Sequence, residues 1–144
     1  MDQSIIKSKI QEFFKLNNLC VISTIHTDGH GPESAVVAFS ETEDLKIIIG
    51  TSNESRKYKN IQSNPNVSLV IGWNSELGTI QYEGVARELT PDESAEYSAL
   101  QVAKNPTSAA YVNRPDQRYF LIQPKWIRLT DNRSGVSEIF EIDL

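Results

Sequence analysis

Residues 45–73 read LKIIIGTSNESRKYKNIQSNPNVSLVIGW, in which two apolar segments flank a polar, basic one. The run 47–49 is apolar on both faces, which is typical of a strand that is covered on both sides. Residues 67–73 alternate apolar and polar side chains with a period of two, as a strand with one buried face does. The stretch therefore predicts a strand, a connecting segment and a second strand.

The connecting segment, residues 51–64, is the most basic short stretch of an acidic chain. Its spacing predicts a short helix that begins near Asn53, which places Arg56 and Lys57 close to the helix N-terminus. Such an end exposes unpaired N–H groups and bears partial positive charge, so two cations and several hydroxyls there predict a phosphate site. On charge alone the segment would be interpreted as a solvated helix face. The order of the motifs along the rest of the chain decides between that interpretation and a phosphate site.

Outside this stretch the pattern predicts a mainly β protein with a few helices. Strands are predicted at 19–25, 34–40, 45–50, 67–73, 79–89, 119–123, 126–130 and 136–142. Helices are predicted over 4–16 and from a capping-box signal at Thr90 to about Lys104. Gly84 predicts a bulge and Pro124 separates two strands. We expect a single domain, 1–144, built as a six- to seven-stranded antiparallel β-barrel.

Bulk composition excludes several classes of function. The chain has 144 residues and a net charge of −5, which argues against nucleic acid or an anionic membrane as a partner. Cys20, the single cysteine, is expected in the core, and the sequence contains no apolar stretch of membrane-spanning length. His26 and His30 are expected to be exposed, and no metal site is predicted. Trp73 and Trp126 are expected in the core or at a dimer interface. The protein is expected to be cytoplasmic.

Several motifs, in this order and at this spacing, resemble the pyridoxamine 5′-phosphate oxidase family. They are Asp28-Gly29 with Pro32, Ser55-Arg56-Lys57, residues 64–67 with Trp73, residues 83–89 with Glu93-Ser94 and Tyr97, and residues 120–124. The resemblance covers most of the chain from Leu19 to Thr130. It implies a split β-barrel of the FMN-binding type and a homodimer with FMN at the subunit interface.

The resemblance also implies which residues contact FMN. The phosphate would be held by Ser55, Arg56 and Lys57, with Thr51 and Ser52 nearby. Backbone groups along the flavin ring would come from Ser34, Ala35, Val36 and Val37. The fifth strand would reach the flavin at Thr79, which aligns with a family glutamine, and less directly at Gln81.

Two departures from the oxidases limit the predicted activity. The family has an Arg and a Lys on its second strand, where this chain has Ser34 and Phe39. The Arg-rich C-terminal segment that contacts pyridoxal phosphate in the oxidases has no counterpart here, so oxidation of pyridoxamine phosphate is not expected. The resemblance therefore implies an FMN-dependent oxidoreductase of this family with an unknown substrate, and no residue stands out as a catalytic acid or base. The alternatives are a non-catalytic flavin-binding or stress-response module, or a split barrel that binds deazaflavin or haem.

Overall fold

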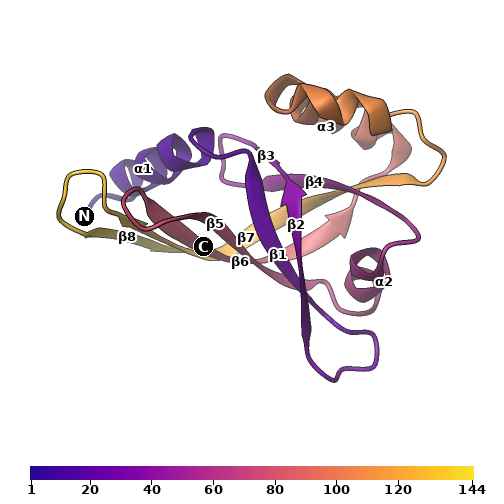
Figure 1. Ribbon diagram of the computed structural model, residues 1–144, viewed down its shortest axis with the longest axis horizontal. Coiled ribbons are helices and arrows are strands. Elements are labelled where there is room, and N and C mark those ends of the chain that lie inside the picture. Colours follow the sequence, from indigo (N-terminus) through magenta and orange to yellow (C-terminus); the bar gives the residue numbers. More distant parts are fainter.

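An eight-stranded antiparallel sheet curls on itself to form the body of the protein (Figure 1). The computed structural model describes residues 1–144. The strands are β1 (Leu19–Ile25), β2 (Pro32–Ala38), β3 (Ser40–Glu41), β4 (Ile47–Ser52), β5 (Asn66–Asn74), β6 (Gly78–Glu88), β7 (Gln117–Asp131) and β8 (Glu138–Asp143). The helices are α1 (Gln3–Lys15), α2 (Arg56–Ser63), α3 (Pro91–Lys104) and the short 3₁₀ helix η1 (Pro106–Tyr111).

The strand order places β2 and β3 at opposite ends of the ladder. Hydrogen-bonded neighbours run β2-β1-β5-β6-β7-β4-β3, and β8 pairs with β7 beyond this path. The curl of the sheet brings β2 back against β4, and α2, which follows β4, lies beside the β1–β2 hairpin (Figure 1). Residues far apart in the sequence therefore meet where β2, β4 and α2 converge.

The mainly β fold was predicted correctly, but the strand count and two boundaries were wrong. The structure has eight strands rather than six or seven, because β2 ends at Ala38 and Ser40 begins the separate strand β3. The predicted strands 119–123 and 126–130 form one strand, β7. Pro124 fits inside it because the register with β6 shifts between Glu83 and Gly84, which confirms the predicted bulge.

The core fills the concave side of the sheet. Helix α1 closes it with Ile6, Ile10, Phe13 and Phe14, all buried at helical spacing. On the other side of β4, Ile48 packs in a smaller cluster with Leu89, Tyr119 and Leu121. The run 47–49 is thus covered on both faces, as predicted, although β4 lies near one end of the ladder rather than at its centre.

Helix α3 stands away from the sheet and is attached at few points (Figure 1). Its predicted capping box is present, with Thr90 and Glu93 bonded reciprocally. Only two of its residues, Ser98 and Gln101, are buried, and both are polar. At its C-terminal end the Lys104 ammonium lies 2.6 Å from a Glu41 carboxylate oxygen. The helix therefore covers a space above the sheet and does not complete the main core.

The predicted burial of the unusual residues is partly confirmed. Cys20 is fully buried. Trp73, the next-to-last residue of β5, is 61% exposed and so does not lie in the core; its alternative place at a dimer interface stays a prediction. The Trp126 indole N–H donates to a Glu141 carboxylate oxygen at 2.7 Å on the sheet surface. None of the helices is both long enough and apolar enough to cross a membrane.

Candidate functional site

The turn between β4 and α2 positions the predicted anchor residues. The Ser55 N–H donates to the Ser52 carbonyl at 3.1 Å, which forms a tight turn before the helix. The Ser55 hydroxyl oxygen then accepts the Tyr58 N–H at 3.2 Å and caps the helix. Helix α2 therefore begins at Arg56 instead of near Asn53, and Arg56 and Lys57 are its first two residues.

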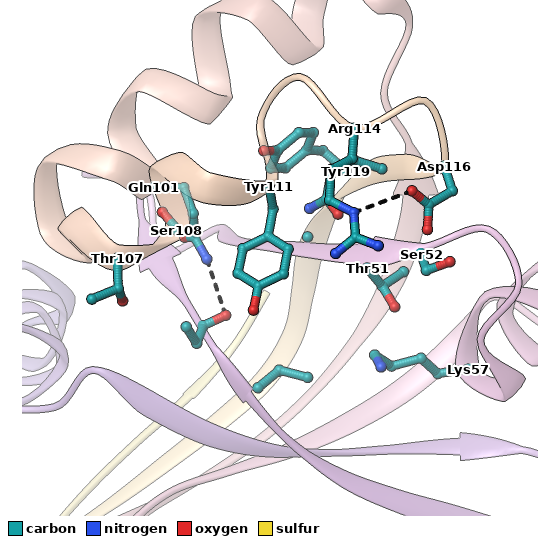
Figure 2. A pocket seen from close by; sticks show the side chains of 14 residues that line it. Thr51, Ser52, Lys57, Gln101, Thr107, Ser108, Tyr111, Arg114, Asp116 and Tyr119 are labelled. Atoms are coloured by element: carbon teal, nitrogen blue, oxygen red, sulfur yellow. Dashed lines mark hydrogen bonds and ion pairs between the residues drawn. The ribbon is translucent and has the colours of Figure 1, made fainter.

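Lys57 is a half-buried cation without a carboxylate partner. No hydrogen bond or ion pair involves its ammonium, and burial lowers its pKa from the ordinary value. Figure 2 shows the side chain extending from α2 into a cavity, toward Thr51 and Ser52. Holding a charge in a partly dry site costs free energy unless an opposite charge is supplied. Lys57 is therefore a cation in this cavity for which the chain itself supplies no paired carboxylate.

We call this space the anchor cavity; it has a volume of about 340 Å³. One wall comes from β2, the end of β4 and the start of α2, and the other from α3, η1, the segment that leads into β7 and the first residues of β7 (Figure 2). Its lining residues are Val37, Ala38, Gly50, Thr51, Ser52, Lys57, Gln101, Thr107, Ser108, Tyr111, Arg114, Asp116, Gln117 and Tyr119. The size falls within the usual range for small-molecule sites, and the lining combines hydroxyls, amides and aromatic rings.

The charged groups at the rim of the anchor cavity are already engaged with one another. Arg114 Nε lies 3.5 Å from an Asp116 carboxylate oxygen, and both side chains border the cavity opposite Lys57 (Figure 2). A hydrogen bond from the Ser52 hydroxyl holds the pKa of Asp116 below its usual value. The Asn53 N–H donates to the Asp116 carbonyl at 2.8 Å. These contacts fix the rim and leave Lys57 as the unpaired charge.

A second space, the β2 cavity, lies on the other side of Lys57 and has a volume of about 160 Å³. Its lining residues are Ile22, Thr24, Glu33, Ser34, Ala35, Arg56 and Lys57. The Arg56 guanidinium forms an ion pair with the Glu33 carboxylate from the start of β2. Because Lys57 borders both cavities, the two spaces meet at the start of α2.

The structure brings most of the predicted cofactor-binding residues together. Thr51, Ser52 and Lys57 line the anchor cavity, and Val37 joins them from β2. The β2 cavity is bordered by Arg56, Lys57, Ser34 and Ala35. Ser55 caps the helix and bonds Thr51, with 2.9 Å between their hydroxyl oxygens.

Val36 lies on β2 between Ala35 and Val37, with its side chain 60% exposed on the opposite face, so the role predicted for its backbone groups stays a prediction. The other two predicted residues lie away from the start of α2. Gln81 is exposed on β6, between Val70 and Arg128 in the sheet register. The Thr79 hydroxyl donates to the Ile71 carbonyl at 3.3 Å. Neither Thr79 nor Gln81 lines the cavities beside α2. A role for these two residues at that site stays a prediction.

The two departures on the second strand have visible consequences. The Ser34 hydroxyl lies 2.8 Å from the Ser23 hydroxyl. Phe39 is fully buried, and the Lys104 ammonium sits 3.8 Å from the centre of its ring while pairing with Glu41. Neither position therefore offers a cation to the anchor cavity. Positive charge for an anion comes from the start of α2.

No sequence pattern marks the opposite wall of the anchor cavity. Residues 105–117 lack the periodicity of a helix or a strand, yet this segment contributes Thr107, Ser108 and Tyr111. Gln101 lies on a helix predicted correctly, but its burial follows from the way α3 docks. Arg114, from the same segment, also borders the cavity.

A curled antiparallel sheet of eight strands with a few helices is the architecture of a split-barrel protein. The model of the pyridoxamine 5′-phosphate oxidase family matches residues 6–131, and the chain belongs to that family. It is 32% identical over 77 residues to a pyridoxine/pyridoxamine 5′-phosphate oxidase of Bacteroides thetaiotaomicron, and this match covers 54% of the chain and 36% of the relative. The corresponding enzyme of Ehrlichia ruminantium is 33% identical over 78 residues, covering 54% and 40%. The matched region thus spans less than half the length of these relatives.

Solved structures confirm the split-barrel fold. General stress protein 26 from Bacillus anthracis superposes with a TM-score of 0.76 at 22% identity, covering 96% of this chain and 98% of that one. A haem-binding protein from Mycobacterium smegmatis gives a TM-score of 0.79 at 16% identity, covering 93% of this chain and 57% of that one. The predicted fold class and family are therefore confirmed.

Proposed function

We propose that this protein binds FMN and acts as a flavin-dependent oxidoreductase on a small molecule other than pyridoxamine phosphate. The observation that supports this most directly is Lys57, a half-buried ammonium beside a capped helix start and without a counter-charge. A phosphate dianion would supply that charge and accept hydrogen bonds from the free N–H groups of α2. FMN, when bound, supplies the redox chemistry.

The residues around the site fit a phosphorylated ligand with an extended body. Lys57 and the start of α2 would hold the phosphate, and the Ser52 hydroxyl lies in the same cavity wall. The body of the ligand would extend along β2, past Ala35 on one side and Val37 on the other. Tyr111 projects into the anchor cavity from η1 (Figure 2) and would shield that part of the ligand from water.

We also propose that the active form is a homodimer with FMN at the subunit interface. Thr79 and Gln81 lie on β6, away from the cavities beside α2 in the same chain, so a second copy would have to present them. The outer face of the sheet supports such a contact, since Val36 and Val70 are exposed there.

A cytoplasmic location is proposed because the core depends on no disulfide.

Haem is the second candidate, because a protein of the same fold is described as haem-binding. The anchor cavity offers Tyr111 and Tyr119 as oxygen ligands, while its lining contains no His, Cys or Met. The unpaired Lys57 favours a phosphate over a haem iron at this site. A non-catalytic flavin-binding module and a deazaflavin ligand remain compatible with the same cavity.

The absorbance spectrum of the purified protein tests the proposal. We expect flavin bands, release of a species with the mass of FMN on denaturation, and bleaching on addition of NADH or NADPH. A Soret band would select haem instead, and a released mass matching a deazaflavin would select that ligand. Flavin bands that neither nicotinamide donor bleaches would favour the non-catalytic module. A colourless protein that takes up no added FMN would refute the proposal.

A further inference from the structure

Glu33 places a negative charge in the β2 cavity, beside the start of α2 where the phosphate is proposed to bind. It is the second residue of β2, pairs with Thr24 of β1 in the sheet register, and faces α2. Its side chain is 18% exposed, and it borders the β2 cavity together with Arg56 and Lys57. A carboxylate in this position is unexpected in a site that attracts an anion.

The Glu33 carboxylate is held in place by groups other than Arg56. Its Oε1 accepts a hydrogen bond from Asn60 Nδ2 at 2.7 Å. Asn60 is itself 2% exposed and also donates to the Thr24 hydroxyl at 3.0 Å. The carboxylate is therefore a fixed part of the contact between β2 and α2, and it is not a mobile surface group.

Arg56 already has a carboxylate partner before any ligand arrives, although its side chain is 78% exposed. Its guanidinium pairs with Glu33, whereas Lys57 has no such partner. The charged groups that border the β2 cavity are two cations and one anion, so their formal sum is +1 instead of +2. A phosphate that reaches Arg56 must share the guanidinium with Glu33, and it also experiences repulsion from that carboxylate.

We propose that Glu33 is a built-in competitor for the ligand phosphate and sets how strongly this chain prefers a phosphorylated flavin to an unphosphorylated one. This inference rests on the proposed function and adds a specificity-determining residue to it. Because the competition is electrostatic and local, Glu33 weakens FMN binding and leaves riboflavin binding unchanged. The preference of the chain for FMN is therefore lower than its cations alone would give.

The test compares the dissociation constants of FMN and riboflavin for the full-length chain freed of bound flavin. Glu33→Gln keeps the acceptor for Asn60 and removes the charge. We expect about a tenfold lower dissociation constant for FMN, with that of riboflavin within about twofold of wild type. Glu33→Ser is a second neutral variant, so the comparison does not depend on one substitution folding.

Glu54→Gln is the matched control, because Glu54 is exposed in the turn before α2 and its carboxylate forms no hydrogen bond or ion pair. Its FMN affinity should change by less than about twofold, since exposed charges are screened. In an Arg56→Gln background the effect of Glu33→Gln should shrink, because the shared guanidinium is gone. An unchanged or weaker FMN preference in the neutral Glu33 variants, or an equal gain in Glu54→Gln, would overturn the inference.

The outcomes separate this inference from the proposed function. A wild-type chain that binds FMN no more tightly than riboflavin would contradict the phosphate anchor itself. A wild-type chain that prefers FMN, with neutral Glu33 variants that show the same preference, would contradict only the role of Glu33.

Discussion

The Thr51 hydroxyl oxygen lies 2.9 Å from the Ser55 hydroxyl oxygen, and this contact joins the end of β4 to the cap of α2. Thr51 is buried, so the bond is shielded from water. Ser55 also accepts the Tyr58 N–H. One small hydroxyl thus fixes both the direction in which α2 leaves the sheet and the placement of the two cations that follow it.

Ser55→Ala should destabilise the protein by about 1 kcal/mol, the usual cost of losing a helix N-cap. The substitution also removes the partner of Thr51, so the start of α2 should loosen and FMN binding should weaken. Urea denaturation measures the first effect and flavin titration the second. Ser63→Ala, at the exposed end of the same helix, should change stability by less than about 0.5 kcal/mol. Equal effects in the two variants would contradict this role for the cap.

The double variant Arg56→Ala/Lys57→Ala should lose FMN affinity by about a hundredfold or more, since each charge-assisted hydrogen bond contributes about 1.5–3 kcal/mol. The fold should be retained, because neither side chain belongs to the core. Circular dichroism checks the fold and flavin fluorescence quenching the affinity. Lys7→Ala/Lys15→Ala removes the same charge from exposed positions on α1 and serves as control. Unchanged FMN affinity in the first variant would refute the site assignment.

Local chemistry explains why one wall of the site could be predicted from the sequence. Ser55, Arg56 and Lys57 are neighbours in the chain, and helix capping depends on residues a few positions apart. The same is true of the capping box at Thr90, which joins residues three positions apart. Signals of this kind are complete within a short window of sequence.

The wall of the anchor cavity that faces Lys57 and the position of Glu33 beside Arg56 both depend on contacts between segments that are distant in the sequence. Tyr111 reaches the anchor cavity only because α3 turns back over the sheet, and no periodicity marks that return. Glu33 meets Arg56 only when the sheet curls and β2 approaches α2. Pro124 predicts a break in β7, because a proline removes a hydrogen-bond donor from its own strand. The bulge that accommodates Pro124 is visible only once β7 is paired with β6.

Lys104→Met should destabilise the fold by about 3 kcal/mol, since it leaves the mostly buried Glu41 carboxylate without its partner. Burial lowers the pKa of Lys104, and the bond to Glu41 opposes that effect. Thermal or urea denaturation measures the loss. Lys46→Met breaks a more exposed pair with Asp44 and should cost less than about 1 kcal/mol. Similar losses in the two variants would show that the contact does not anchor α3.

Glu93 should make the stability of the protein depend on pH in the acid range. Its carboxylate accepts two hydrogen bonds from Arg87, at 2.9 and 3.0 Å, and one from the Thr90 N–H at 3.0 Å. The bonds from Arg87, and then that from Thr90, lower the pKa of Glu93 to about 2 from an ordinary value of 4.5. The folded state therefore holds this proton less tightly than the unfolded state does.

The sign of the effect follows from that difference. Above pH 4.5 the Glu93 carboxylate is charged in both the folded and the unfolded state, and its full contribution to the free energy of unfolding is present. As pH falls toward about 2, the unfolded state takes up the proton first, so this stabilisation is lost. Glu93→Gln retains an acceptor for Thr90 but loses the charge. Its melting temperature should lie below that of wild type near neutral pH, and the gap should close between pH 4.5 and about 2. Glu96→Gln, an exposed change on the same helix, should follow the wild-type curve. A gap between wild type and Glu93→Gln that stays constant across this range would show that the charge of Glu93 does not stabilise α3.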